Sequence, residues 1–293
     1  MRTLRLVTLL AILAPLLAGP AWAQESVKFR AAGTPPTALQ MRMAKQLGEE
    51  AKATPGLQLH GQLHLPTRGK APYPALVLLH DCRGITGTIE DWALRLADWG
   101  YMSLVVDSYG PRRHKPGCGS YDDVESVDQT FDALGALQFL GRRDDVIGDR
   151  IGLIGWSIGG SKVLAAMNKI GVHNLYAEKF HFGVAFYPQC LTASGPFIGP
   201  ILMLIGGADD WTKAQRCQTL SDANSNSAHP PHLRIYPAAY HFFDDPGAGP
   251  VRYRPEIENR EKSPTRGATW GHDPAAQRTA LGHVRDFLAR QRP

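Results

Sequence analysis

One segment near the middle of the chain constrains its fold most strongly, because an apolar run passes directly into a glycine-rich turn and then a helical pattern. Residues 150–154 have the length of a buried parallel strand, and residues 160–170 predict a helix with its apolar side chains on one face. Between them stands Gly-Trp-Ser-Ile-Gly, residues 155–159. The two glycines suit a tight strand-to-helix turn in which a side chain would collide with neighbouring backbone. The segment therefore predicts a nucleophile elbow that raises the Ser157 hydroxyl toward solvent.

A serine nucleophile needs a histidine that takes its proton and a carboxylate that orients the histidine. In a strand–elbow–helix architecture both partners follow the serine in sequence, with the acid first. The apolar run 200–205 breaks into Gly-Gly-Ala-Asp-Asp, which places Asp209 on a loop just beyond a strand end. A later predicted strand leads into a loop that carries His241. We therefore predict that Ser157, Asp209 and His241 form a catalytic triad, with Asp210 as the alternative acid.

Acyl transfer also needs backbone N–H donors that stabilise the oxyanion of the tetrahedral intermediate. Ile158 follows the nucleophile and is expected to supply one of them. The second usually comes from the loop after an early strand, and the apolar run 75–79 is followed by His-Asp-Cys-Arg-Gly, residues 80–84. We expect Cys82 to be this donor. The same loop is also compatible with a capped turn leading into a helix around Trp92, and both interpretations can hold together.

Several motifs in this order make the chain resemble the dienelactone hydrolase family of the α/β-hydrolase superfamily, over roughly residues 57–288. The resemblance rests on LHDCRG (79–84), VVDSYGPR (105–112), GWSIGG (155–160), YPQC (187–190), IGGADDWT (205–212) and YPAAYHFFD (236–244). It implies a serine or cysteine hydrolase that acts on esters or lactones. It also implies triad positions at Ser157, Asp209 and His241, and an oxyanion position at Cys82.

The chain departs from this family pattern at the nucleophile. The family's founding enzymes carry cysteine there, in a G-x-C-x-G-G setting, whereas this chain has Ser157. The departure favours a secreted serine carboxylesterase over lactone specificity of the founding kind. Asp81 matches a family position where an acidic residue can contact the nucleophile, and we assign it no catalytic role.

Apolar runs alternate with helical patterns along the chain, which predicts an α/β fold with a mostly parallel sheet covered by helices on both faces. The expected strands are residues 57–65, 75–79, 102–107, 151–155, 182–186, 200–205 and 233–236. The expected helices are residues 89–99, 122–140, 160–170, 212–221 and 274–291. We expect one α/β-hydrolase domain over residues 24–293. Ligands bind outside the carboxyl ends of such strands, where the proposed catalytic residues fall.

The first 23 residues indicate a signal peptide, with a basic start, an apolar stretch at residues 6–17 and Ala-Trp-Ala before the expected cleavage site. The mature chain would begin at Gln24. No later segment approaches the roughly 18 uninterrupted apolar residues of a membrane span. We therefore expect export to a bacterial periplasm or to the exterior.

An oxidising compartment would allow the four cysteines to form disulfides. Three connectivities are possible. We favour Cys82 with Cys118 and Cys190 with Cys217, because each pair lies on loops that leave the same edge of the sheet. Free buried thiols are the alternative.

Charge and aromatic residues give weaker indications. Loss of Arg2 and Arg5 with the signal peptide lowers the formal net charge from +5 to +3, which indicates neither nucleic acid nor anionic membrane as a partner. Arg112 lies just after the predicted strand 102–107, where it could bind a substrate carboxylate or belong to a solvated loop. Some aromatic residues beside the motifs could line an acyl pocket or simply pack in the core: Trp156, Tyr187, Trp211 and Tyr240.

The predicted reaction is acyl transfer to water from a small-molecule ester or lactone, and it uses no metal or organic cofactor. No spacing of histidines and cysteines resembles a metal-ligand set. The same triad could instead act on peptides or thioesters, or transfer an acyl group to an alcohol, because fold and triad do not choose the leaving group. A further alternative is a binding protein that uses a hydrolase fold without catalysis.

Overall fold

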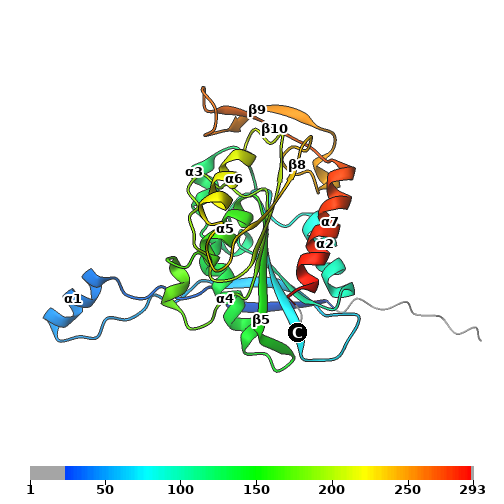
Figure 1. Cartoon of the computed structure of the whole chain (residues 1–293). Helices are drawn as coiled ribbons and strands as arrows, with labels where there is room; N and C mark the ends of the chain where they lie inside the picture. The colour runs from blue at the N-terminus through cyan, green and yellow to red at the C-terminus, as the bar shows by residue number, and fades with distance from the viewer. Residues whose placement is uncertain (1–23, 292–293) are drawn as a thin grey trace, which may run out of the picture.

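A central sheet of eight strands organises the chain, which a computed structural model describes over residues 24–291 (Figure 1). The strand order is β1-β2-β4-β3-β5-β6-β7-β8. The six strands from β4 to β8 in this order pair in parallel, whereas β1 and β2 add an antiparallel edge. The strands are β1 (Gln24–Arg30), β2 (Gln58–His64), β3 (Tyr73–Leu79), β4 (Met102–Asp107), β5 (Val146–Trp156), β6 (Gly183–Phe186), β7 (Ile201–Gly206) and β8 (His232–Tyr236).

Helices cover both faces of this sheet, as the alternating sequence pattern predicts. Figure 1 shows α2 (Gly87–Asp98) and α7 (Pro274–Ala289) on one face. The other face carries α4 (Gln129–Gly141), α5 (Ile158–Met167) and α6 (Ala214–Ala223). Central strands such as β7 are buried along their whole length, because helices exclude water from both of their faces. All seven predicted strands are present, and the predicted α/β class is confirmed.

The predicted helix at residues 122–140 is wrong, because the chain breaks into two helices there. The short α3 (Tyr121–Glu125) ends before Ser126, and α4 begins only at Gln129. The Asp128 side chain accepts a hydrogen bond of 3.0 Å from the Thr130 N–H and so caps the new helix. An aspartate that bonds its own backbone in this way competes with helix continuation. The break leaves α3 free to lie over the carboxyl end of the sheet.

Two features outside the sheet's core were not predicted. Residues 33–56 extend away from the body and carry α1 (Ala38–Leu47), none of whose residues is buried (Figure 1). Near the C-terminus, β9 (Arg252–Glu258) and β10 (Arg266–Trp270) pair in a separate antiparallel ribbon. Their sequences are largely polar, so they lack the apolar runs that identify the strands of the main sheet.

The structure pairs Cys82 with Cys118 and Cys190 with Cys217, which agrees with the favoured connectivity. The first disulfide joins the loop after β3 to the segment before α3. The second joins the loop after β6 to α6. No helix among residues 24–291 is long and apolar enough to cross a membrane. The predicted signal peptide, residues 1–23, lies outside the described residues.

We predict that the purified protein contains no free thiol, because both pairs are bonded. A thiol titration of denatured, unreduced protein should find none, and two or four reactive thiols would contradict the pairing.

Replacing Cys190 and Cys217 together by alanine should lower the free energy of unfolding by about 2–4 kcal/mol, because the unfolded chain loses a restraint. Urea denaturation measures this loss.

Candidate active site

Ser157 lies in the sharp turn between β5 and α5, as the sequence predicts. Its backbone has φ 53° and ψ −114°, a conformation that residues with side chains rarely adopt and that is typical of strained functional positions. A Cβ atom at Gly155 would collide with the backbone of Gly159, and one at Gly159 would meet the Leu79 carbonyl. Glycine is therefore required on both sides of Ser157, because the turn is packed backbone against backbone.

The structure brings Ser157, His241 and Asp209 together from three separate loops. His241 Nε2 lies 2.9 Å from Ser157 Oγ, and His241 Nδ1 lies 2.7 Å from Asp209 Oδ2. A carboxylate can only accept at Nδ1, so the proton sits there and Nε2 is left to accept from the serine hydroxyl. All three side chains are buried or nearly so. The arrangement can move a proton from the hydroxyl to the imidazole.

Asp209 is fixed by donors of its own loop. Its Oδ1 accepts from the N–H groups of Trp211 and Thr212, at 2.9 and 2.8 Å. The Thr212 hydroxyl donates to Oδ2 at 2.8 Å and lies 3.1 Å from His241 Nδ1. Hydrogen bonds of this kind hold the carboxylate at one angle to the imidazole.

The alternative acid Asp210 points elsewhere. Its carboxylate accepts from the Thr269 N–H at 2.7 Å and from the Lys262 ammonium at 2.6 Å. Both donors belong to the ribbon formed by β9 and β10 or to its connecting turn. Asp210 therefore anchors the ribbon to the loop after β7, while Asp209 faces the imidazole.

Cys82 and Ile158 line the same pocket as Ser157. Neither backbone N–H donates to another group within residues 24–291. Two N–H groups beside a nucleophile are the arrangement that an oxyanion requires. The Cys82–Cys118 disulfide ties the Cys82 loop to the pocket wall.

Arg83 connects the loop of Cys82 to the loop of His241. It pairs with the Asp81 carboxylate and, at 2.7 Å, with Asp245, and its guanidinium lies 3.7 Å above the Phe242 ring. Burial opposes the charge, but Asp81 and Asp245 together raise the pKa of Arg83. Asp81 is thus occupied by Arg83, in keeping with our assigning it no catalytic role.

A second carboxylate, Asp244, fastens the His241 loop to the core. It accepts from the indole N–H groups of Trp92 and Trp156, at 3.1 and 3.0 Å, and from the Tyr187 hydroxyl at 2.7 Å. Burial raises the pKa of Asp244, and these three donors oppose that shift. The indole of Trp156 and the ring of Tyr187 therefore support the site from beneath.

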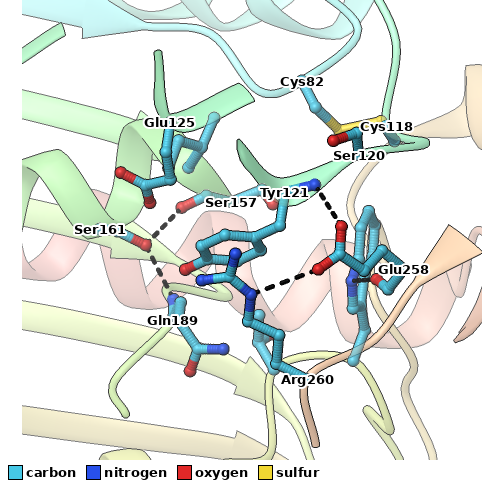
Figure 2. A pocket seen from close by; sticks show the side chains of 13 residues that line it. Cys82, Cys118, Ser120, Tyr121, Glu125, Ser157, Ser161, Gln189, Glu258 and Arg260 are labelled. Carbon is cyan, nitrogen blue, oxygen red and sulfur yellow. Dashed lines mark hydrogen bonds and ion pairs between the residues drawn. A yellow bond between two sulfur atoms is a disulfide. The ribbon is translucent and has the colours of Figure 1, made fainter. Parts of the chain in front are cut away.

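A narrow pocket of about 40 Å³ opens beside the Ser157 hydroxyl (Figure 2). Of the aromatic residues predicted to line it, only Trp211 does. Trp156 and Tyr187 are instead buried around Asp244, and Tyr240 lies away from the pocket. Further lining residues come from α3, from α5, from the β9 end and from neighbouring loops: Ser120, Tyr121, Glu125, Ser161, Gln189, Thr212, Glu258 and Arg260.

Glu258 and Arg260 were not predicted, because they reach the pocket from a part of the chain that is far from Tyr121 in sequence. The Glu258 carboxylate accepts from the Tyr121 N–H at 2.9 Å, although 137 positions separate them (Figure 2). The Glu258 carbonyl also accepts from the Trp211 indole at 3.0 Å. No local pattern in the sequence reports such contacts. Within residues 24–291, no group of three or more His, Cys, Asp or Glu residues is placed to hold a metal ion.

Arg112 does not bind in the pocket, so the prediction of a substrate contact there is wrong. Its guanidinium makes two hydrogen bonds of 2.8 Å to Asp132, whose side chain is fully buried on α4. Burial raises the pKa of Asp132, and Arg112 opposes that shift. A buried carboxylate needs a counter-charge, and Arg112 provides it.

Solved structures of α/β-hydrolases have the same arrangement of sheet and helices. A dienelactone hydrolase-like promiscuous phosphotriesterase from metagenomic libraries matches with a TM-score of 0.62 at 18% identity, covering 92% of this chain and 99% of that one. An esterase of Thermogutta terrifontis matches with a TM-score of 0.55 at 13% identity, covering 80% and 90%. The fold is therefore an α/β-hydrolase fold.

The amino-acid sequence assigns the chain to a family within this fold. The model of the dienelactone hydrolase family matches residues 59–291, and the chain belongs to that family. A curated Bradyrhizobium protein, "Probable 2-oxo-3-(5-oxofuran-2-ylidene)propanoate lactonase", is 24% identical over 188 residues, which cover 59% of this chain and 74% of that protein. Membership in this family makes the protein a hydrolase.

We predict that Arg112→Ala lowers the free energy of unfolding by about 3 kcal/mol or more, because it leaves the Asp132 carboxylate buried without its partner. Arg143→Ala is the matched control. Arg143 is as exposed as Arg112, at 25% against 24%, but its partner Asp145 is 36% exposed and can be solvated. The control should lose less than about 1 kcal/mol. Equal losses in urea denaturation would contradict a structural role for Arg112.

Proposed function

We propose that the protein is a serine hydrolase that cleaves carboxylic esters through an acyl-enzyme on Ser157. The observation that carries the proposal is the continuous contact from Ser157 Oγ to His241 and from His241 to Asp209. Such a relay is needed to make a serine hydroxyl nucleophilic at neutral pH. The strained backbone of Ser157 also supports a functional role.

The first half of the reaction forms the acyl-enzyme. His241 Nε2 takes the Ser157 proton while Oγ attacks the ester carbonyl carbon, and Asp209 stabilises the imidazolium that results. The N–H groups of Cys82 and Ile158 donate to the oxygen that becomes negatively charged. His241 then gives its proton to the departing alcohol oxygen, and the carbon–oxygen bond breaks.

The second half returns the enzyme to its starting state. A water molecule enters where the alcohol left, and His241 takes one of its protons as it attacks the acyl carbon. The same two N–H groups hold the second oxyanion. Collapse of the intermediate breaks the bond to Ser157 Oγ, which recovers its proton from His241, and releases the carboxylic acid.

The names of related proteins support hydrolysis at such a centre. The curated relative is named a lactonase, and one of the matching structures is an esterase. A lactone is a cyclic ester, so the same steps open it, with the alcohol remaining attached to the acyl group. Lactones are therefore included in the proposed substrate range.

We further propose that the chain is exported and cleaved before Gln24. The support is that all four cysteines form disulfides, which persist in oxidising compartments and are rare in the bacterial cytosol. The mature chain would then begin at Gln24 and contain the α/β-hydrolase domain predicted over residues 24–293.

We predict that Ser157→Ala abolishes ester turnover while leaving the unfolding transition in place. Asp209→Asn should lower kcat about 10⁴-fold, because an amide cannot hold the histidine in the required tautomer. Asp210→Asn is the matched control next to it, and it should keep most of the activity. The rate of p-nitrophenolate release from p-nitrophenyl acetate measures the activity of all three variants. An active Ser157→Ala protein would rule out the mechanism.

We predict that the protein recovered from the periplasm or the medium begins at Gln24. Intact mass measurement of the purified chain, combined with peptide sequencing of its N-terminus, checks the cleavage site. A mature chain that retains residues 1–23 would contradict both the signal peptide and export by that route.

A further inference from the structure

The charges around the pocket are unevenly distributed. Two of its lining residues are glutamates, Glu125 and Glu258, and one is a cation, Arg260 (Figure 2). Their outer ion-pair partners include Asp122 and Lys162. Three carboxylates thus face two cations, so the pocket and its rim carry an excess of negative charge.

The pocket's cation is already engaged by protein groups. The Arg260 guanidinium donates to Glu258 at 3.3 Å and to Asp122, and it lies 3.8 Å above the Tyr121 ring. Two carboxylates therefore share one guanidinium. A substrate carboxylate at this place would compete with both of them for the guanidinium.

Neighbouring groups provide no substitute cation. The Lys162 ammonium, which is nearly buried, bonds Glu125 at 2.8 Å and does not line the pocket. Burial, and then the charge of Glu125, raise the pKa of Tyr121 to about 12, so its hydroxyl stays neutral. Arg112, the residue that sequence analysis offered as a carboxylate ligand, is bound to Asp132.

The pocket also limits the size of what it can hold. About 40 Å³ of free space lies beside Ser157, whereas one water needs roughly 10–15 Å³ measured in the same way. Only a few non-hydrogen atoms fit without movement of the walls. The disulfide Cys82–Cys118 and the Glu258–Tyr121 bond hold two of those walls together.

We propose that this site selects esters whose acyl group carries no negative charge. The proposal rests on the esterase function proposed above and narrows its substrate class. Glu125 and Glu258 act as specificity-determining residues, because their charge repels an anionic acyl group close to the reacting carbon. The curated relative is named for a propanoate, which is an anion, so this chain would differ from it in substrate charge.

The test compares two p-nitrophenyl esters that share a leaving group and a four-carbon acyl chain. The butyrate is neutral, and the monosuccinate ends in a carboxylate. Each kcat/KM is corrected by subtracting the spontaneous release of p-nitrophenolate from the same ester in buffer, which is faster for the succinate because its own carboxylate attacks the ester. We expect the corrected ratio to favour the butyrate by about tenfold or more at low ionic strength, and to shrink as salt screens the charges.

Two variants identify the groups responsible. Glu125→Gln removes a pocket charge and should lower the butyrate-to-succinate ratio several-fold. Glu178→Gln removes an exposed glutamate outside the pocket and should leave the ratio unchanged. A change of equal size in both variants would assign the selectivity to overall charge and overturn the proposal.

The outcomes separate this inference from the function on which it rests. Hydrolysis of both esters at equal corrected rates, or faster hydrolysis of the succinate, overturns charge selection and leaves the esterase intact. Failure to hydrolyse either ester overturns the proposed function and this inference with it.

Discussion

The turn at Ser157 is the constraint on which the rest of the site depends. A backbone with φ 53° at a residue that has a side chain is costly, and the surrounding structure must fix it. Here the fixing comes from close backbone packing, because Gly159 lies against the Leu79 carbonyl at the end of β3. The same contact brings the loop that follows β3, with Cys82, beside the serine. Ser157 and the loop of Cys82 are therefore positioned by one packing interaction.

Buried carboxylates hold the remaining parts in place. Asp244 anchors the His241 loop to the indoles of Trp92 and Trp156, and Asp245 joins it to Arg83 on the loop of Cys82. Asp210, which is only partly buried, fastens the β9–β10 ribbon in a similar way. Each carboxylate meets donors or a cation that compensate its burial, which is the condition for a buried charge to stabilise a site. The loops can therefore be rigid although they carry little regular structure.

The sequence predicts what depends on local pattern and misses what depends on distant contacts. The central strands and the positions of Ser157, Asp209 and His241 follow from apolar runs and the loops at their ends. The pairing of Arg112 with Asp132 depends on how two elements pack in space, which the local sequence does not show. Arg112 was therefore interpreted as a group that binds a substrate carboxylate, because it follows a strand at the edge of the sheet where ligands bind. Pocket residues such as Glu258 were missed for the same reason.

The central claim is that Ser157 is the one nucleophile activated by this site. Treating the purified protein with a fluorophosphonate and locating the adduct by peptide mass spectrometry tests it most directly. The account predicts a single adduct on Ser157, with loss of ester hydrolysis in proportion to labelling. Full activity without an adduct, or an adduct on another residue, would contradict it.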